Sequence, residues 1–366
     1  MICSNCVLDD TINGIYFDGN GICNFCKEHS SSINKRVESN STILNGIISK
    51  IKRESSGPYD CVIGLSGGVD SSYLAFFLVK IAGLKPLAVH VDNGWNTALA
   101  VQNIKKIVEK LNIDLCTEVL DWDIFRDVQL AFFRANLPDI EIPTDHIINS
   151  VLYKVAISNK IKYIINGMVY KEESISVPEW SYGHSDLKYL SAVLKSQSWR
   201  CFPPSLPHFS LLKLFGYLFF YRVRVISMLN YLDYNKEKAQ NLLMKEVGYI
   251  PYIGKHNESF ITKFLQDYIL IKKFNYDKRK GHLSGMIYSK AIERQEALLL
   301  LEKKPYVSKA DIDYFCDKMG IERVEFDTII NNGKKYSFRN FQNNYSLIVF
   351  LKKIYNTLRL LKIVYK

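Results

Sequence analysis

The segment Ser66-Gly67-Gly68-Val69-Asp70-Ser71-Ser72 combines small, hydroxyl and acidic residues in a pattern suited to binding phosphate. A β-prone apolar run, residues 60–65, precedes it, and a helical period begins at Leu74. Glycine lets the backbone approach an anion, serine adds hydroxyl donors, and a helix N-terminus offers N–H groups. No Lys follows the glycine pair and the GxGxxG spacing is missing, which argues against a Walker A loop and a dinucleotide fold. The segment therefore predicts a phosphate loop between a strand and a helix, with a plain glycine-rich turn as the alternative.

Two cysteine pairs near the N-terminus have the spacing of a zinc ribbon: sixteen residues separate Cys3 and Cys6 from Cys23 and Cys26. The turn-forming residues 18–21 lie between the pairs, and so short a stretch has too few apolar residues to fold by burial alone. We expect structural Zn²⁺; redox-active or disulfide-paired thiols are the alternative, which a reducing cytosol disfavours. The other cysteines are expected to be packing residues: Cys61, Cys116, Cys201 and Cys316.

The composition is that of a folded globular protein, since 48% of the 366 residues are hydrophobic and 23% are charged. The formal net charge of +11 favours polyanionic partners such as nucleotides, nucleic acid, phosphorylated sugars or an anionic membrane surface. Residues 1–6 do not resemble a signal peptide, and charged residues interrupt the most apolar segment, 210–232. We therefore expect a cytoplasmic protein without a transmembrane segment.

The elements that must position the phosphate loop alternate between strands and helices. Strands are expected over 86–91, 114–120 and 163–166, and helices over 97–111 and 122–135. This alternation predicts an α/β fold with a doubly wound parallel sheet. His90, Asp92 and Asn93 end the second strand, where the carboxyl edge of the sheet would meet a nucleotide. Thr144 and Asp145 lie in a turn and are interpreted either as a helix N-cap or as part of the active-site edge.

The carboxyl-terminal third is predicted to be mainly helical, and residues 209–300 contain fifteen basic and eight acidic residues. Two clusters, 254–259 and 275–284, place basic, acidic and imidazole groups beside glycine and serine. They are either solvated loops or partly buried sites that bind a diphosphate and move protons. The expected domains are a zinc ribbon over 1–30, a polar connector over 31–57, an ATP-binding domain over 58–200 and a mainly helical substrate or partner domain over 201–366.

The phosphate loop resembles the PP-loop of ATP pyrophosphatases, whose fold is of the adenine nucleotide alpha hydrolase type. The order of the cysteine pairs, the SGGVDSS loop, HVDNGW, EIPTDH, GKHNES and YDKRKGHLS resembles the bacterial N-acetyl sugar amidotransferase family over nearly the whole chain. The resemblance implies O-antigen or related surface-sugar biosynthesis. An acetamido group on a sugar, nucleotide-linked or related, would become acetamidino at the expense of ATP, with Mg²⁺ on the phosphates. Ammonia would come from a glutaminase subunit through a cyclase-like subunit.

The resemblance also implies roles for individual residues. Asp70 would anchor Mg²⁺ and take part in catalysis, and His256 and Glu258 would act as acid–base groups. Sugar or diphosphate binding would fall to Asp145, Lys255, Lys278 and Arg279. The pyrophosphate and nucleotide would contact Ser66, Gly67, Gly68, Asp70, Ser71, Ser72, His90, Asp92, Asn93 and Thr144.

One segment departs from the family pattern. Residues 167–174 are less polar than the family's stretch, which leaves the roles of Glu172 and Glu173 open. Two other functions are compatible with the sequence: a tRNA-modifying PP-loop enzyme of the thiolase type, and a non-catalytic zinc-ribbon scaffold. Nucleic acid is the less favoured partner because the cysteines after the ribbon are isolated rather than paired.

Overall fold

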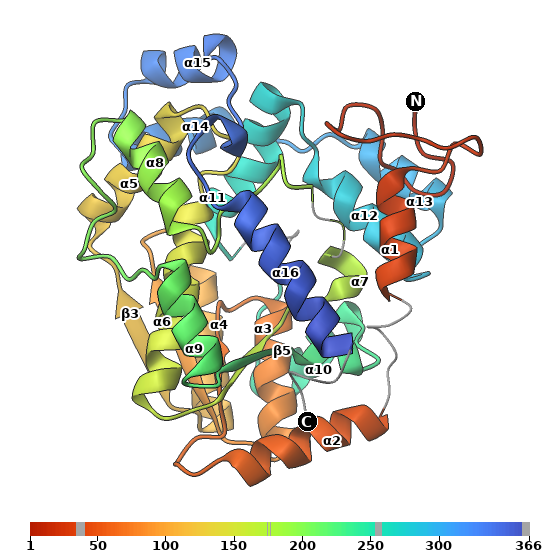
Figure 1. Cartoon of the computed structure of the whole chain (residues 1–366), viewed down its shortest axis with the longest axis vertical. Helices are drawn as coiled ribbons and strands as arrows, with labels where there is room; N and C mark the ends of the chain where they lie inside the picture. Colours follow the sequence, from red (N-terminus) through yellow and green to blue (C-terminus); the bar gives the residue numbers. More distant parts are fainter. Residues whose placement is uncertain (34–40, 174, 176, 253–257, 361–366) are drawn as a thin grey trace.

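A five-stranded parallel sheet forms the centre of the protein, seen here in a computed structural model that describes all residues except 34–40, 174, 176, 253–257 and 361–366 (Figure 1). The strand order is β3-β2-β1-β4-β5, and each neighbouring pair is parallel. The strands are β1 (Cys61–Gly64), β2 (Pro86–Asp92), β3 (Leu115–Val119), β4 (Tyr163–Asn166) and β5 (Arg224–Ser227). The α/β fold with a parallel sheet is therefore confirmed.

Helices cover both faces of the sheet, and successive strand residues point to opposite faces. Val62 and Ile164 belong to the hydrophobic cluster on one face, whereas Ile63 and Ile165 belong to the cluster on the other. The first face is covered by α5 (Trp122–Arg134), α6 (Ile142–Ser158) and α8 (Leu187–Ser196), and the second by α2 (Ser41–Glu54), α3 (Val69–Phe76), α4 (Ala98–Leu111) and α10 (Lys236–Val247). Burial on both faces explains why the central strands are almost continuously apolar.

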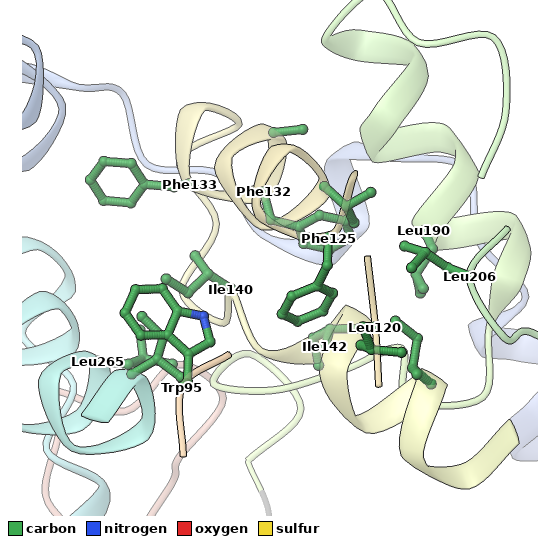
Figure 2. Close-up of a cluster of buried hydrophobic side chains, with 14 of the residues drawn as sticks. Trp95, Leu120, Phe125, Phe132, Phe133, Ile140, Ile142, Leu190, Leu206 and Leu265 are labelled. Carbon is green, nitrogen blue, oxygen red and sulfur yellow. The ribbon is translucent and has the colours of Figure 1, made fainter. Parts of the chain in front are cut away.

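The first cluster is rich in aromatic side chains (Figure 2). Phe125 and Phe132 project from α5 and are fully buried, and Trp95 lies in the same cluster with 1% of its surface exposed. The indole N–H of Trp95 donates to Gln129 Oε1 at 2.6 Å, so burying this polar atom carries little penalty. This core holds the loop after β2 against α5. It thereby fixes one side of the sheet edge at which we expect the nucleotide to bind.

Several elements differ from the sequence prediction. β5 pairs in parallel with β4, although its residues lie in a stretch that we expected to be helical. α3 passes directly into a π-helix, Phe77–Ile81, rather than continuing as an α-helix. Cys201 is exposed, so its expected packing role is wrong, whereas Cys61 and Cys316 are buried. The domain boundaries at 30, 57 and 200 stay predictions, although the sheet draws its fifth strand from beyond residue 200.

The carboxyl-terminal part is helical, as expected, and folds back on the sheet domain. Its helices are α11 (Phe260–Phe264), the π-helix η3 (Leu265–Phe274), α12 (Lys278–Tyr288), α13 (Arg294–Glu302), α14 (Lys309–Met319), α15 (Arg323–Asn332) and α16 (Tyr345–Leu360). Between β4 and β5 lie α7 (Tyr170–Glu173), α8 and α9 (Leu211–Phe219). Helix α1 (Asn24–Ile33) begins directly after Cys23 and contains Cys26. Among the residues described, no helix combines the length and apolar character needed to cross a bilayer.

Candidate active site

The phosphate loop follows β1 directly and depends on Gly67. Its φ of +82° is in the left-handed region, and a Cβ at this position would lie 2.5 Å from the carbonyl oxygen of Ala100. The loop backbone therefore lies against the first turn of α4, where no side chain fits. The expected strand, glycine loop and helix are all present, with α3 beginning at Val69.

The hydroxyl groups of the loop bond to one another and to its backbone. Ser66 Oγ and Ser71 Oγ are 3.1 Å apart, and the Gly68 N–H donates to Ser66 Oγ at 3.3 Å. The N-cap of α3 is Gly68, so no side chain caps the start of this helix. The backbone N–H groups of its first turn are therefore suited to binding an anion. Ser72 differs from the prediction in its placement, because its side chain is completely buried in the core.

Asp70 lies in the first turn of α3, where two groups from α10 and the preceding segment hold its carboxylate. The hydroxyl of Tyr234 donates a hydrogen bond to Asp70, and Lys236 Nζ lies 3.5 Å from Asp70 Oδ2. Gly167 approaches the backbone of Asp70 closely, since a Cβ there would lie 3.3 Å from its carbonyl carbon. The carboxylate is thus positioned at the phosphate loop by partners far away in the sequence.

A cavity of about 950 Å³ opens beside the phosphate loop. Residues at the carboxyl ends of β1, β2 and β4 line one side, including Ser66, His90 and Asn166, and helices α6, α11 and α12 line the others. Open α/β sheets bind ligands at this edge. The volume lies at the upper end of the range for small-molecule sites, so the cavity has room for a nucleotide together with a second substrate.

The expected nucleotide-edge residues are not equivalent. His90 and Asn93 line the cavity, and the ring of His90 makes a hydrogen bond to the carbonyl oxygen of Leu65 at 3.0 Å. Burial lowers the pKa of His90, which favours the neutral ring. Asp92 is not among the lining residues; its Oδ1 accepts from the Gly94 N–H at 3.0 Å and so shapes the turn after β2.

Thr144 and Asp145 both line the cavity, and neither is the N-cap of α6. The helix begins at Ile142 with Glu141 as its N-cap residue, and Pro143 occupies the first turn. The capping interpretation of Thr144 and Asp145 is therefore wrong, because the helix begins two residues before Thr144. Both side chains belong to the cavity wall.

Acidic and imidazole groups gather on the α6 side of the cavity, in a group we call the acidic cluster: Asp139, Glu141, Asp145 and His184. Asp145 Oδ2 lies 3.3 Å from His184 Nε2, and Thr262 Oγ1 donates to Glu141 Oε1 at 2.7 Å. From α12, Lys278 Nζ approaches Asp139 Oδ2 to 3.5 Å. Through Thr262 and Lys278, the acidic cluster thus contacts segments that lie more than a hundred residues away along the chain.

The members of the acidic cluster have different proton affinities. Burial and the negative charge of Asp139 raise the pKa of Glu141 to about 8, against the hydrogen bond from Thr262. Burial is the largest single influence on Asp139 and acts to raise its pKa. The charges of Lys278 and His184 and the hydrogen bonds from Ser181 and the Glu141 backbone together outweigh burial, so the net pKa is lowered. Desolvation lowers the pKa of His184, but the bond and charge of Asp145 outweigh it and raise the pKa. Groups that titrate near neutrality are suited to proton transfer.

Glu258 connects the carboxyl-terminal part to the phosphate loop. A Cβ at Gly68 would lie 3.5 Å from Glu258 Oε1, so the Glu258 carboxylate lies over the loop. Its backbone carbonyl accepts from the Thr97 N–H at 3.1 Å, and the Phe260 N–H donates to the Trp95 carbonyl at 3.2 Å. These backbone bonds hold the start of α11 against the edge of the sheet.

The two predicted cationic residues of α12 have different surroundings, although both line the cavity. Lys278 faces Asp139. Arg279 forms an ion pair with Asp277, in which Nη2 lies 2.6 Å from Oδ2. Its Nη1 also donates a hydrogen bond to the carbonyl oxygen of Lys303 at 2.6 Å. The Arg279 guanidinium therefore also ties α12 to the end of α13.

The four ribbon cysteines meet in one buried cluster, with all Sγ atoms within 4.8 Å of one another. Cys3 Sγ and Cys26 Sγ are 3.4 Å apart, and Cys6 Sγ and Cys23 Sγ are 3.9 Å apart. A tetrahedral Zn²⁺ with Zn–S bonds of about 2.3 Å places sulfurs about 3.8 Å apart. The four thiols therefore fit a structural zinc site, which Cys3, Cys6, Cys23 and Cys26 would form.

The ribbon packs on the helices that form the far wall of the cavity. Arg294 Nη2 donates to the carbonyl oxygen of Cys3 at 2.8 Å, and Lys280 Nζ lies 2.5 Å from Asp9 Oδ2. Val177 and Trp180 belong to the hydrophobic cluster of the ribbon and also line the cavity. Folding of the ribbon thus supports the α12 wall from behind.

Several residues of the cavity were not predicted from the sequence: Asp139, Glu141, Ser181, His184 and Thr262. Glu141 belongs to the EIPTDH motif that we recognised, but nothing in the sequence distinguished it from a surface carboxylate. Lys255 and His256 lie outside the described residues, as does the side chain of Glu172, whereas Glu173 lines the cavity. Their proposed roles stay predictions.

Parts of the chain resemble known proteins. Residues 258–355 match the family model "LPS biosynthesis protein WbpG-like, C-terminal domain". A glutamine-hydrolyzing GMP synthase from Thermosipho africanus is 27% identical over 205 residues, covering 52% of this chain and 37% of the relative. An NH3-dependent NAD synthetase from Methanococcoides burtonii is 26% identical over 112 residues, covering 29% of this chain and 39% of the relative. The chain thus spans less than half the length of these two curated relatives.

Solved structures similar to the chain include an NH3-dependent NAD synthetase from Campylobacter jejuni, at 14% identity and a TM-score of 0.31, covering 73% of this chain and 97% of that structure. Another is an NMN synthetase from Francisella tularensis, at 17% identity and a TM-score of 0.32, covering 80% and 92%. The family match and the two curated relatives support the assignment of this chain to the PP-loop ATP pyrophosphatase superfamily. The family match also relates its carboxyl-terminal part to LPS biosynthesis proteins.

Proposed function

We propose that the protein is an ATP-dependent amidotransferase that converts the acetamido group of a bacterial sugar into an acetamidino group. The observation that carries this proposal is the position of the acidic cluster in the same cavity as the phosphate loop. One side of the cavity is suited to a triphosphate and the other to proton transfer. The match to an LPS biosynthesis family supports a surface-sugar substrate.

The first step activates an unreactive amide. The acetamido oxygen attacks the α-phosphorus of ATP, a P–O bond forms, and the bond to the leaving pyrophosphate breaks. An amide carbonyl is a poor electrophile, and adenylation turns its oxygen into part of a good leaving group. The loop residues Ser66, Gly67, Gly68 and Ser71 would hold the departing pyrophosphate through backbone N–H and hydroxyl groups.

Mg²⁺ fits between the loop and two carboxylates of this chain. Asp70 and Glu258 both lie at the loop, and carboxylates beside a triphosphate are stable only where cations separate the negative charges. When bound, the ion would neutralise charge on the phosphates. Asp70 would serve as a ligand or hold a bound water, and Glu258 is the second candidate.

The second step needs ammonia rather than ammonium, because only the unprotonated form is a nucleophile. Ammonia attacks the imidate carbon, a C–N bond forms, and the C–O bond breaks as AMP leaves with its oxygen. Proton acceptors near the imidate would be Glu141 and His184, whose pKa values are both raised. The names of the two curated relatives refer to glutamine hydrolysis and to NH3, which supports ammonia as the nitrogen donor.

The remaining assignments concern the substrate and the partners. Asp145 from α6 and Lys278 and Arg279 from α12 would contact the sugar or its diphosphate, since all three line the cavity. Glutaminase and cyclase-like subunits would supply the ammonia through a route closed to water, because water would hydrolyse the imidate.

The test combines ATP, Mg²⁺, an ammonium salt and a panel of acetamido sugars, nucleotide-linked and free, with product masses and nucleotides as readouts. We expect AMP and pyrophosphate together with a sugar whose mass reflects exchange of O for NH. Asp70→Asn should abolish AMP formation in a folded protein, while Asp317→Asn, an exposed control on α14, should not change it. Sugar-independent ADP formation, or AMP formation that depends on tRNA, would contradict the proposal.

A further inference from the structure

Helix α9 is apolar on both of its sides, yet none of its residues is buried. Leu214 and Tyr217 pack against the hydrophobic cluster on the first face of the sheet. On the outer side, Leu212, Phe215 and Phe219 are spaced as a helical stripe and are 81%, 48% and 51% exposed. A helix with apolar residues all round is normally buried, so the outer side of α9 is suited to a further apolar partner.

The exposed apolar surface continues past the end of α9. Phe220 is 82% exposed and Tyr221 is 56% exposed, and Val225 on the edge strand β5 is 47% exposed. The rings of Phe215 and Phe219 stack on each other with centroids 4.1 Å apart. We call this surface, formed by the outer side of α9 and residues 220–225, the α9 surface.

The α9 surface lies in a basic stretch of the chain. Residues 187–232 contain no Asp or Glu, and six basic residues occur there: Lys188, Lys195, Arg200, Lys213, Arg222 and Arg224. Lys213 and Arg222 flank the aromatic stripe and are exposed. Arg224 is different, because it pairs with Glu54 at 3.2 Å. Aromatic and basic side chains therefore share one surface to which this stretch contributes no negative charge.

A second exposed apolar helix, α16, has the same charge pattern. Leu347, Phe350 and Leu351 are 47%, 59% and 44% exposed. No acidic residue follows Asp327 in the sequence. In Figure 1, α9 and α16 are both drawn on the side of the molecule turned toward the viewer.

We propose that the α9 surface docks on an anionic lipid bilayer, with the aromatic outer side of α9 lying in the interface between headgroups and acyl chains. Aromatic rings are favoured at the boundary between headgroups and acyl chains, and Lys and Arg are attracted to anionic lipids. A second copy of the chain fits less well, because a two-fold contact through this surface would bring its cations together. The proposal does not depend on the reaction catalysed in the cavity.

The experiment is flotation of the full chain with vesicles of phosphatidylcholine alone or mixed with phosphatidylglycerol. We expect flotation with the anionic vesicles and release at high salt. Phe220→Ser should weaken the partition coefficient roughly tenfold through lost apolar burial, and Lys213→Glu by about fivefold or more. Tyr306→Ser and Lys304→Glu are controls, since Tyr306 is also 82% exposed and Lys304 is exposed away from α9.

Circular dichroism checks that each variant is folded, and light scattering gives its mass. The proposal is overturned if the chain does not float with anionic vesicles, or if the controls lose flotation as much as the α9 variants do. It is also overturned if Phe220→Ser converts a dimer to a monomer without changing vesicle binding, since the surface would then serve self-association. AMP formation without vesicles should be the same in wild type and all four variants.

Discussion

Glu141 provides a quantitative test of the acidic cluster, through the substitution Glu141→Gln. The side chain keeps its shape, and the amide oxygen still accepts from Thr262 Oγ1, at 2.7 Å in the wild type. In the folded chain the pKa of Glu141 is raised from 4.5 to about 8. The folded state therefore holds a proton that the unfolded state releases between these values. The contribution of this bound proton to the free energy of unfolding is fully present below pH 4.5. It is lost as the pH rises through about 8.

The pKa difference between 4.5 and about 8 corresponds to about 5 kcal/mol of unfolding free energy. Gln cannot ionise, so the variant does not lose this free energy. Relative to wild type, its stability should rise steadily from acidic to neutral pH and level off in alkaline solution. Urea unfolding of the ligand-free full chain at several pH values measures the difference. A difference between the two proteins that does not change with pH would refute the raised pKa, and equal AMP formation rates would refute the catalytic role.

Three further outcomes are expected. Gly67→Ala should weaken ATP binding at least tenfold in a calorimetric titration, because the new Cβ would lie 2.5 Å from the Ala100 carbonyl oxygen in a left-handed backbone; unchanged affinity would exclude this loop as the phosphate site. Cys23→Ser, or chelation of the metal, should lower the melting temperature and release zinc measurable by mass spectrometry, whereas Cys201→Ser should not. His184→Ala should shift the acidic limb of the pH–rate profile for amidine formation, measured at a fixed concentration of unprotonated ammonia, because one of the two groups with a raised pKa is then absent; an unchanged profile would exclude His184 as a proton acceptor.

The parallel sheet and the phosphate loop were predictable because their signals are local. β1, β2 and β4 are short apolar runs, and the loop glycines follow β1 directly. The cysteine spacing likewise identified the cluster that the structure brings together. β5 was missed because its four residues include Arg224, and its edge position buries only part of each side chain.

The acidic cluster could not be predicted, because long-range contacts create it. Glu141 is unremarkable until the fold buries it and brings Thr262 beside it, and His184 lies in an irregular segment without periodicity. Ser72 illustrates the opposite case: a hydroxyl inside a recognised motif that the helix turns toward the core. A motif gives residue types, whereas the direction of each side chain depends on the helix that begins within it.

In the proposed reaction, the phosphate loop presents the α-phosphorus of ATP to a carbonyl oxygen in the adjoining cavity. The most direct measurement uses an acetamido sugar whose carbonyl carries a heavy oxygen isotope, followed by mass analysis of the nucleotide product. We expect the label to appear in AMP in step with amidine formation. Unlabelled AMP, or the label recovered in inorganic phosphate alongside ADP, would contradict it.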